Sequence, residues 1–206
     1  MTTASPNSVT ARWISGRLVL ATACFALAIQ CASAANLHDG LVAYWPLDEG
    51  TGDIAYDTFG TEMDNGQVRE DPDWLDAGDA ILGDSALRFD GFAQDVLVPS
   101  SSDLDITTNA VTVSAWVNTD LLPTDLFEPY GAVYDSSQDA YILYFDRGEQ
   151  ELRFKVTTAD GIAERPGVPE AMLTVDSWHH VMGVYDGSEG VAKIYYDGVP
   201  VDRHQN

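Results

Sequence analysis

The sequence has only two cysteines, Cys24 and Cys31, and both lie near the N-terminus. No disulfide framework can therefore stabilise the rest of the chain, and no thiols are available there for metal binding or redox chemistry. Basic residues are also scarce, since 10 Lys and Arg stand against 33 Asp and Glu and the formal net charge is −23. Such a field repels phosphate groups, so we expect neither nucleic acid nor an anionic membrane surface as a partner.

Long apolar runs are also few, and the one that stands out covers residues 18–29. Arg12 and Arg17 precede it, and the small residues of Ala32-Ser33-Ala34 follow it. Twelve residues are too few to cross a bilayer as a helix, although a retained anchor is the alternative interpretation. The pattern predicts a secretory signal peptide over residues 1–34 and a single domain over 35–206. We therefore expect a secreted, extracellular or bacterial envelope protein with no membrane span in the mature chain.

The mature segment has almost no helical periodicity. Short apolar or alternating runs recur instead, separated by turn residues at spacings near ten, and we interpret each as a strand. These runs are 41–47, 85–89, 95–98, 111–117, 131–134, 140–145, 151–157, 178–185 and 191–196. The acidic stretch 69–84 is interpreted as an irregular loop.

Two features of these runs indicate antiparallel sheets. In residues 111–117 the odd positions are Val, Val, Ala and Val, which places one apolar face on the strand. Asp-Gly pairs, such as Asp197-Gly198, favour the positive backbone angles of tight hairpin turns. The sequence therefore predicts an all-β sandwich or barrel.

Several motifs, in the same order along the chain, resemble those of bacterial laminin-G-like (concanavalin-A-like) lectin domains. They are LVAYWPLDEGTG at 41–52, ALRFDG at 86–91, TVSAWV at 112–117, WHHV at 178–181 with YDG at 185–187, and YYDGVPV at 195–201. The resemblance implies an antiparallel jelly-roll sandwich. The family continues through further strands past the point that corresponds to Asn206, so we expect a C-terminally truncated sandwich that lacks its last strands.

The resemblance also implies a structural calcium ion. On this basis the expected ligands are Asp57 and the Asp64-Asn65 turn, with Asp48 or Asp90 as a second choice. Calcium takes six to eight oxygen ligands, which carboxylates and carbonyls supply. The middle of this loop, FGTEM at 59–63, departs from the family pattern, and ordinary turn aspartates are the alternative interpretation.

Catalytic motifs are missing. Retaining glucanases of related fold need paired carboxylates in an E-x-D-x-x-E run, and no such run occurs in the sequence. Asp103 and Asp105 have the right first spacing, but the serines before them indicate a loop. His179 and His180 are adjacent and should point to opposite faces of one strand, with no Ser-His-Asp motif beside them. We therefore predict no catalytic residues.

Aromatic side chains are the candidates for ligand binding, because their faces can stack on sugar rings. We choose Tyr130, which follows Pro129 in an expected loop, together with Tyr134. The tryptophans at 45, 74, 116 and 178 are interpreted as core residues.

The sequence thus favours a secreted, non-catalytic lectin-like module that binds an extracellular glycan or protein. Two alternatives stay open. The chain could be a structural or adhesion domain of a larger cell-surface protein, or an accessory domain of a secreted glycoside hydrolase.

Overall fold

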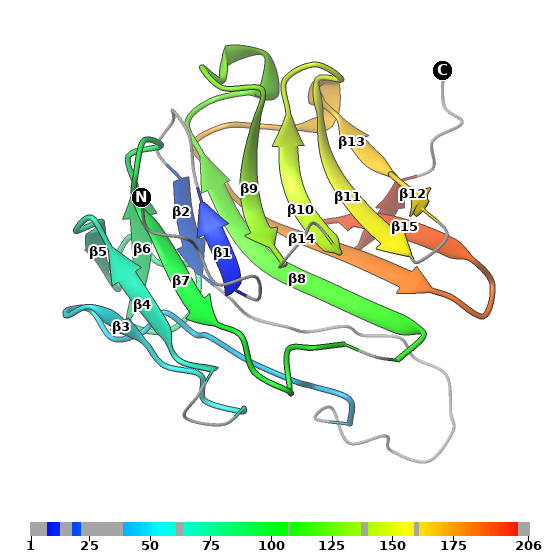
Figure 1. Cartoon of the computed structure of the whole chain (residues 1–206). Coiled ribbons are helices and arrows are strands. Elements are labelled where there is room, and N and C mark those ends of the chain that lie inside the picture. The colour runs from blue at the N-terminus through cyan, green and yellow to red at the C-terminus, as the bar shows by residue number, and fades with distance from the viewer. Residues whose placement is uncertain are drawn as a thin grey trace, which may run out of the picture.

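The structure is a computed structural model, and it describes residues 8–12, 18–21, 39–60, 64–106, 108–136, 140–158 and 161–201. Two antiparallel sheets face each other in this part of the chain (Figure 1). This is the all-β sandwich that the sequence predicts.

One sheet has nine strands within the described residues. In spatial order they are β12 (Gly161–Glu164), β11 (Glu151–Thr158), β10 (Tyr141–Asp146), β9 (Tyr130–Asp135), β1 (Ser8–Arg12), β7 (Asp95–Pro99), β4 (Gly66–Arg69) and β3 (Ile54–Ala55), while β13 (Gly167–Pro169) also pairs with β11.

The facing sheet has seven strands within the same part of the chain. Their order is β16 (Val199–Val201), β15 (Val191–Tyr196), β14 (Trp178–Asp186), β8 (Ala110–Thr119), β2 (Leu18–Ala21), β6 (Ser85–Phe89) and β5 (Asp73–Asp76). Strands β3 and β5 end the two sheets on the same side of the molecule (Figure 1).

The core lies between the sheets and consists of alternating residues from both. Leu152, Phe154 and Val156 of β11 are at most 5% exposed, and they contact Val181 and Ile194 in one cluster. Burying a side chain of this size stabilises the fold by about 1.5–3 kcal/mol. The alternation read from the sequence therefore corresponds to the inward face of the strands.

Two strands come from the segment predicted to be a signal peptide. Strand β1 pairs with β7 and β9, and β2 pairs with β6 and β8, so each takes a central position in its sheet. These pairings belong to the uncleaved chain. Cleavage after residue 34 stays a prediction, and it would remove both central strands.

Most of the predicted strands are confirmed, and the run at 41–47 is an exception. Its backbone bonds to a turn instead of a sheet, because Tyr44 N donates to Asp57 Oδ1 and Tyr44 O accepts from Thr58 N, both at 2.9 Å. The acidic stretch 69–84 is not wholly irregular either, since it contains the edge strand β5.

Gly183 sets how closely the two sheets approach. A Cβ built at this position would overlap the ring of the fully buried Phe154 on the facing sheet. We expect Gly183→Ala to lower the free energy of unfolding by about 1–3 kcal/mol through overpacking. Thermal unfolding of Gly183→Ala and Gly78→Ala measures this, because an added Cβ at Gly78 meets no atom within 4 Å. Equal melting temperatures for the two variants would contradict the expectation.

Candidate functional site

A tight turn after β3 is built around the side chain of Asp57. One carboxylate oxygen, Oδ1, accepts hydrogen bonds from the backbone N–H groups of Tyr44, Phe59 and Gly60, each at 2.9 Å. Aspartate favours such turns because its short side chain reaches the backbone two residues further on. The turn therefore fixes the orientation of the Asp57 side chain, and its other oxygen, Oδ2, points away from these three N–H groups.

That second oxygen faces Asp64. Asp64 is fully buried, and its backbone carbonyl accepts a 2.7 Å bond from the indole of Trp45. The two carboxylates lie close together beside Gly60. A Cβ built on this glycine would overlap Asp57 Oδ2 and lie 2.9 Å from Asp64 Oδ2. The structure thus brings together two of the residues predicted to bind calcium.

Three of the four carboxylate oxygens of this pair have no hydrogen-bond donor among the residues that the structure describes. Asp57 Oδ2, Asp64 Oδ1 and Asp64 Oδ2 are all buried without a hydrogen-bond partner. Burying a carboxylate without a donor or a counter-charge is costly, and two neighbouring carboxylates repel each other. A hard divalent cation between them would remove both costs, so the donor set fits calcium.

Asn65, the third predicted ligand, has a structural contact instead. Its side-chain oxygen accepts a 2.9 Å bond from the backbone N–H of Asp57. Across the described ranges, no group of three or more His, Cys, Asp or Glu could hold a metal ion. A cation at the Asp57–Asp64 pair would therefore need backbone carbonyls or water for its remaining ligands.

The second-choice ligands lie in other turns. Asp48 Oδ1 accepts from the backbone N–H groups of Asp84 at 3.0 Å and Ser85 at 3.4 Å, which joins the segment before β3 to the start of β6. Asp90 Oδ1 accepts from Phe92 N at 2.9 Å within its own turn. Both carboxylates thus have backbone donors, unlike the facing oxygens of Asp57 and Asp64.

A β-bulge separates the two predicted ligand tyrosines. The pairing of β9 with β10 shifts between Leu143 and Tyr144, so Tyr130 and Tyr134 no longer share a face. Tyr130 is 55% exposed and makes an edge-to-face contact with Tyr144 at 6.3 Å between ring centroids. It remains a candidate.

Tyr134 points the other way, into the core. Its ring stacks on Tyr141 at 5.6 Å, and burial raises the pKa of its hydroxyl well above the usual 10. The ring is therefore covered on one face by Tyr141 and is only partly exposed, so it offers a poorer stacking surface for a sugar than Tyr130 does.

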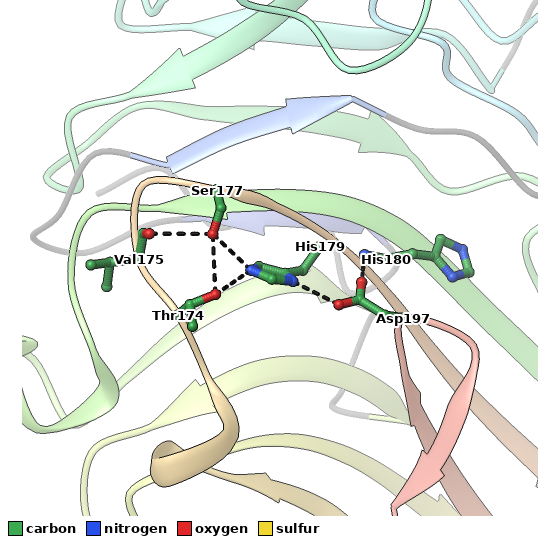
Figure 2. A network of polar contacts seen from close by, with 6 residues as sticks. All are labelled: Thr174, Val175, Ser177, His179, His180 and Asp197. Atoms are coloured by element: carbon green, nitrogen blue, oxygen red, sulfur yellow. Dashed lines mark hydrogen bonds and ion pairs between the residues drawn. The ribbon is translucent and has the colours of Figure 1, made fainter.

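The adjacent histidines point to opposite faces of β14, as predicted. Figure 2 shows His179 in a polar network that sequence reasoning missed. Its Nδ1 lies 2.8 Å from Asp197 Oδ2, and its Nε2 lies 2.9 Å from Ser177 Oγ and 2.6 Å from Thr174 Oγ1. Asp197 lies 18 residues downstream, in the turn between β15 and β16, so no local motif reveals the arrangement.

Ser177, His179 and Asp197 are connected by hydrogen bonds in the way that a hydrolase triad is. The surroundings nevertheless favour a structural role over a catalytic one. Asp197 Oδ1 also accepts from His180 N at 2.9 Å, and His179 stacks on Tyr196 at 4.7 Å. The adjoining crevice, which Thr174 and His179 help to line, has a volume of only about 10 Å³. That space holds about one water molecule and no substrate. We therefore assign the network to joining the loop before β14 to the β15–β16 hairpin.

His180 gives the fold a dependence on pH. Burial lowers the pKa of its imidazole below 6.5, and the charge of Asp197 opposes this only in part. At low pH the unfolded chain therefore binds a proton at His180 more readily than the folded chain does. Neutral His180 contributes fully to the free energy of unfolding above about pH 6.5, and this contribution is lost as the pH falls through the folded-state pKa. We expect the wild type to lose more stability than His180→Asn between about pH 7 and pH 5. Denaturant unfolding at both pH values measures this, and parallel losses would contradict it.

The fold and the site define the class: a concanavalin-A-like β-sandwich with a carboxylate pair in a loop at one edge. A family model for the concanavalin A-like lectin/glucanases superfamily matches residues 89–206, and the chain belongs to this superfamily. No curated protein and no solved structure matches the chain. The Asp57–Asp64 pair lies outside the matched residues, so its interpretation depends on its own geometry.

Membership supports a lectin-like or binding module in general. Domains of the laminin-G-like kind are generally non-catalytic and typically extracellular. Among the residues that the structure describes, no helix has the length and apolar character needed to cross a membrane.

Proposed function

We propose that this chain is an exported, non-catalytic lectin-like module that binds an extracellular glycan or protein, with a calcium ion held at Asp57 and Asp64. Membership of the concanavalin A-like superfamily is the observation that carries the proposal. The segment with signal-peptide character and the acidic, nearly cysteine-free composition support export.

The non-catalytic part of the proposal is supported by the positions of the acidic residues. Asp103 and Asp105 are exposed and lie in a turn, where they form no paired strand carboxylates. Glu149 lies in the turn between β10 and β11 and is also exposed. Retaining glycosidases need two carboxyl groups about 5 Å apart on either side of the scissile bond.

The calcium part depends on the three buried oxygens without donors at Asp57 and Asp64. In this role calcium neutralises the two carboxylates and stabilises the loop between β3 and β4. The ion is thereby a structural component rather than a reactive one, and the pair would be its protein anchor.

The experiment is a binding screen with the purified chain on an array of neutral, amino and acidic glycans, with calcium or with a chelator. We expect retention on a subset of glycans and no release of reducing ends from them. Reducing ends released by the wild type, or an ester hydrolysed by the wild type and not by Ser177→Ala, would overturn the non-catalytic assignment. If the chain binds no glycan, only the proposal that it binds an extracellular protein is left. Binding to purified extracellular matrix proteins then tests that proposal.

A further inference from the structure

An open recess lies where the two sheets end on the same side of the molecule. It has a volume of about 470 Å³ and is lined by residues next to β3, β4 and β5. We call it the edge recess. Its lining residues are Thr51, Gly52, Asp53, Val68, Asp71, Pro72 and Trp74. Ligand pockets for small molecules typically have volumes of about 300–1,000 Å³, so the edge recess is large enough for one.

Trp74 joins the two sheets at this edge. It stands opposite Leu87 in the β5–β6 pairing and therefore points inward, and its indole N–H donates to Gly52 O at 2.9 Å. The Asp53 carbonyl next to it accepts from Val68 N at 2.8 Å and from the Gln67 side chain at 2.7 Å. The indole is thus held in place while it remains partly exposed in the edge recess.

The other rim is a turn in an unusual backbone conformation. Glu70 and Asp71 have φ values of 59° and 55°, in the left-handed region that non-glycine residues rarely adopt. The side chain of Gln94 donates to both of their carbonyls at 3.2 Å, and buried Pro72 follows. Neighbouring contacts therefore over-determine the turn and fix where Asp71 enters the edge recess.

The chemistry of the lining combines an aromatic ring with oxygen acceptors. The side chains of Asp53 and Asp71 are exposed, and in the described part of the chain no hydrogen bond or ion pair engages either carboxylate. Thr51 adds a hydroxyl. A sugar ring matches this set, because its C–H face can lie on the indole while its hydroxyls donate to carboxylates.

The charges restrict the sugar further. Two local carboxylates, on a chain with a net charge of −23, repel sulfated, phosphorylated and uronic-acid glycans. Building on the proposed lectin function, we propose that the edge recess binds a neutral saccharide unit through Trp74, Asp53 and Asp71. The family model does not match this segment of the chain, so the site is argued from these residues alone.

Affinity electrophoresis of the purified chain tests the proposal. The gels contain a neutral β-glucan, mannan or xylan, and polygalacturonate serves as the anionic polymer. We expect at least one neutral polymer to retard the wild type and polygalacturonate not to. Asp53→Asn/Asp71→Asn should weaken that binding about tenfold to a hundredfold, since hydrogen bonds to charged groups contribute about 1.5–3 kcal/mol.

Two further variants guard against unfolding and misassignment. Trp74→Phe keeps an aromatic ring but loses area and the bond to Gly52, and we expect about tenfold weaker binding with an unchanged circular dichroism spectrum. Asp105→Asn, an exposed turn residue elsewhere, should bind like the wild type. If Tyr130→Ala loses binding while the recess variants keep it, the lectin function stands and the edge recess proposal fails.

Two other outcomes overturn the assignment in different ways. If the wild type binds no neutral polymer, the edge recess proposal fails, and the glycan function fails with it only if the amino and acidic glycans of the array are not bound either. If oligolysine binds instead, and salt and Asp53→Asn/Asp71→Asn abolish that binding, the edge recess takes a basic peptide and not a sugar.

Discussion

We expect a cooperative unfolding transition for the full chain and the loss of that transition in a shortened chain of residues 35–206. The shortened chain lacks β1 and β2, which lie between β7 and β9 in one sheet and between β6 and β8 in the other. Both sheets would then be split near the middle, and four strands would have exposed edges. We expect a broad melt and a concentration-dependent sedimentation profile.

The size of this effect follows from the pairing. The strands Ser8–Arg12 and Leu18–Ala21 each pair on both sides, and a net hydrogen bond contributes about 1 kcal/mol. Their sum is comparable to the whole stability of a domain, which is about 5–15 kcal/mol. Leu87, Phe89, Val96 and Val98 of the adjoining strands would also lose their paired residues in β1 and β2.

Two controls separate strand loss from simple shortening. A peptide of residues 8–21, added to the shortened chain, should restore part of the cooperative transition, and a scrambled peptide should not. In the full chain, Thr10→Pro should lower the melting temperature, because Thr10 is paired with both Leu97 and Asp135 and proline cannot donate to a ladder. A sharp melt of monomeric 35–206 would show that β1 and β2 are dispensable.

This prediction also bears on the signal peptide. If cleavage occurs after residue 34 and the domain still folds, other strands must take the two central positions. Mass spectrometry of the exported protein, together with the melt of 35–206, distinguishes a retained N-terminal segment from replacement by a strand donor.

The alternating apolar strands could be read from the sequence because burial on one face leaves a period of two. Leu152, Phe154 and Val156 are the clearest example, and all three lie in the core. The run 41–47 is also rich in apolar residues but forms no strand, since Asp57 accepts a hydrogen bond from the backbone N–H of Tyr44. A side-chain contact between residues 13 apart leaves no local signal in the sequence.

The candidate site was predicted in part for similar reasons. Asp57 and Asp64 lie in one short loop, so a local motif brings them together. Tyr134 was chosen together with Tyr130, but a bulge that depends on the partner strand β10 turns the two side chains to different faces. Trp74 was interpreted as a core residue, and it does point inward, but its edge strand leaves it open to the edge recess. Exposure at a sheet edge depends on strand order, which the sequence does not state directly.

Asp64→Asn is expected to abolish the stabilisation of the chain by calcium and to raise its melting temperature in chelator. The wild type buries three carboxylate oxygens of Asp57 and Asp64 without donors. When the free calcium concentration is about one hundred times the dissociation constant, binding stabilises a folded protein by about 2.7 kcal/mol. For a chain of this size that corresponds to a rise of roughly 5–10 °C in melting temperature.

The rise in melting temperature that Asp64→Asn is expected to cause in chelator follows from the loss of a negative charge. Without a cation, two buried carboxylates face each other across Gly60. Asparagine at position 64 removes one charge and supplies an N–H₂ group that can donate to Asp57 Oδ2. The variant should therefore melt higher than the wild type in chelator and lower than the wild type in calcium, so the order of the two melting temperatures reverses.

Asp90→Asn is the matched control. Asp90 accepts one backbone bond in its own turn, which asparagine can also accept, so this variant should keep the full calcium response. Magnesium should stabilise the wild type less than calcium, because it demands a regular octahedral site and gives up its water reluctantly. An equal calcium response in Asp64→Asn, or none in the wild type, would contradict a calcium ion at the Asp57–Asp64 pair.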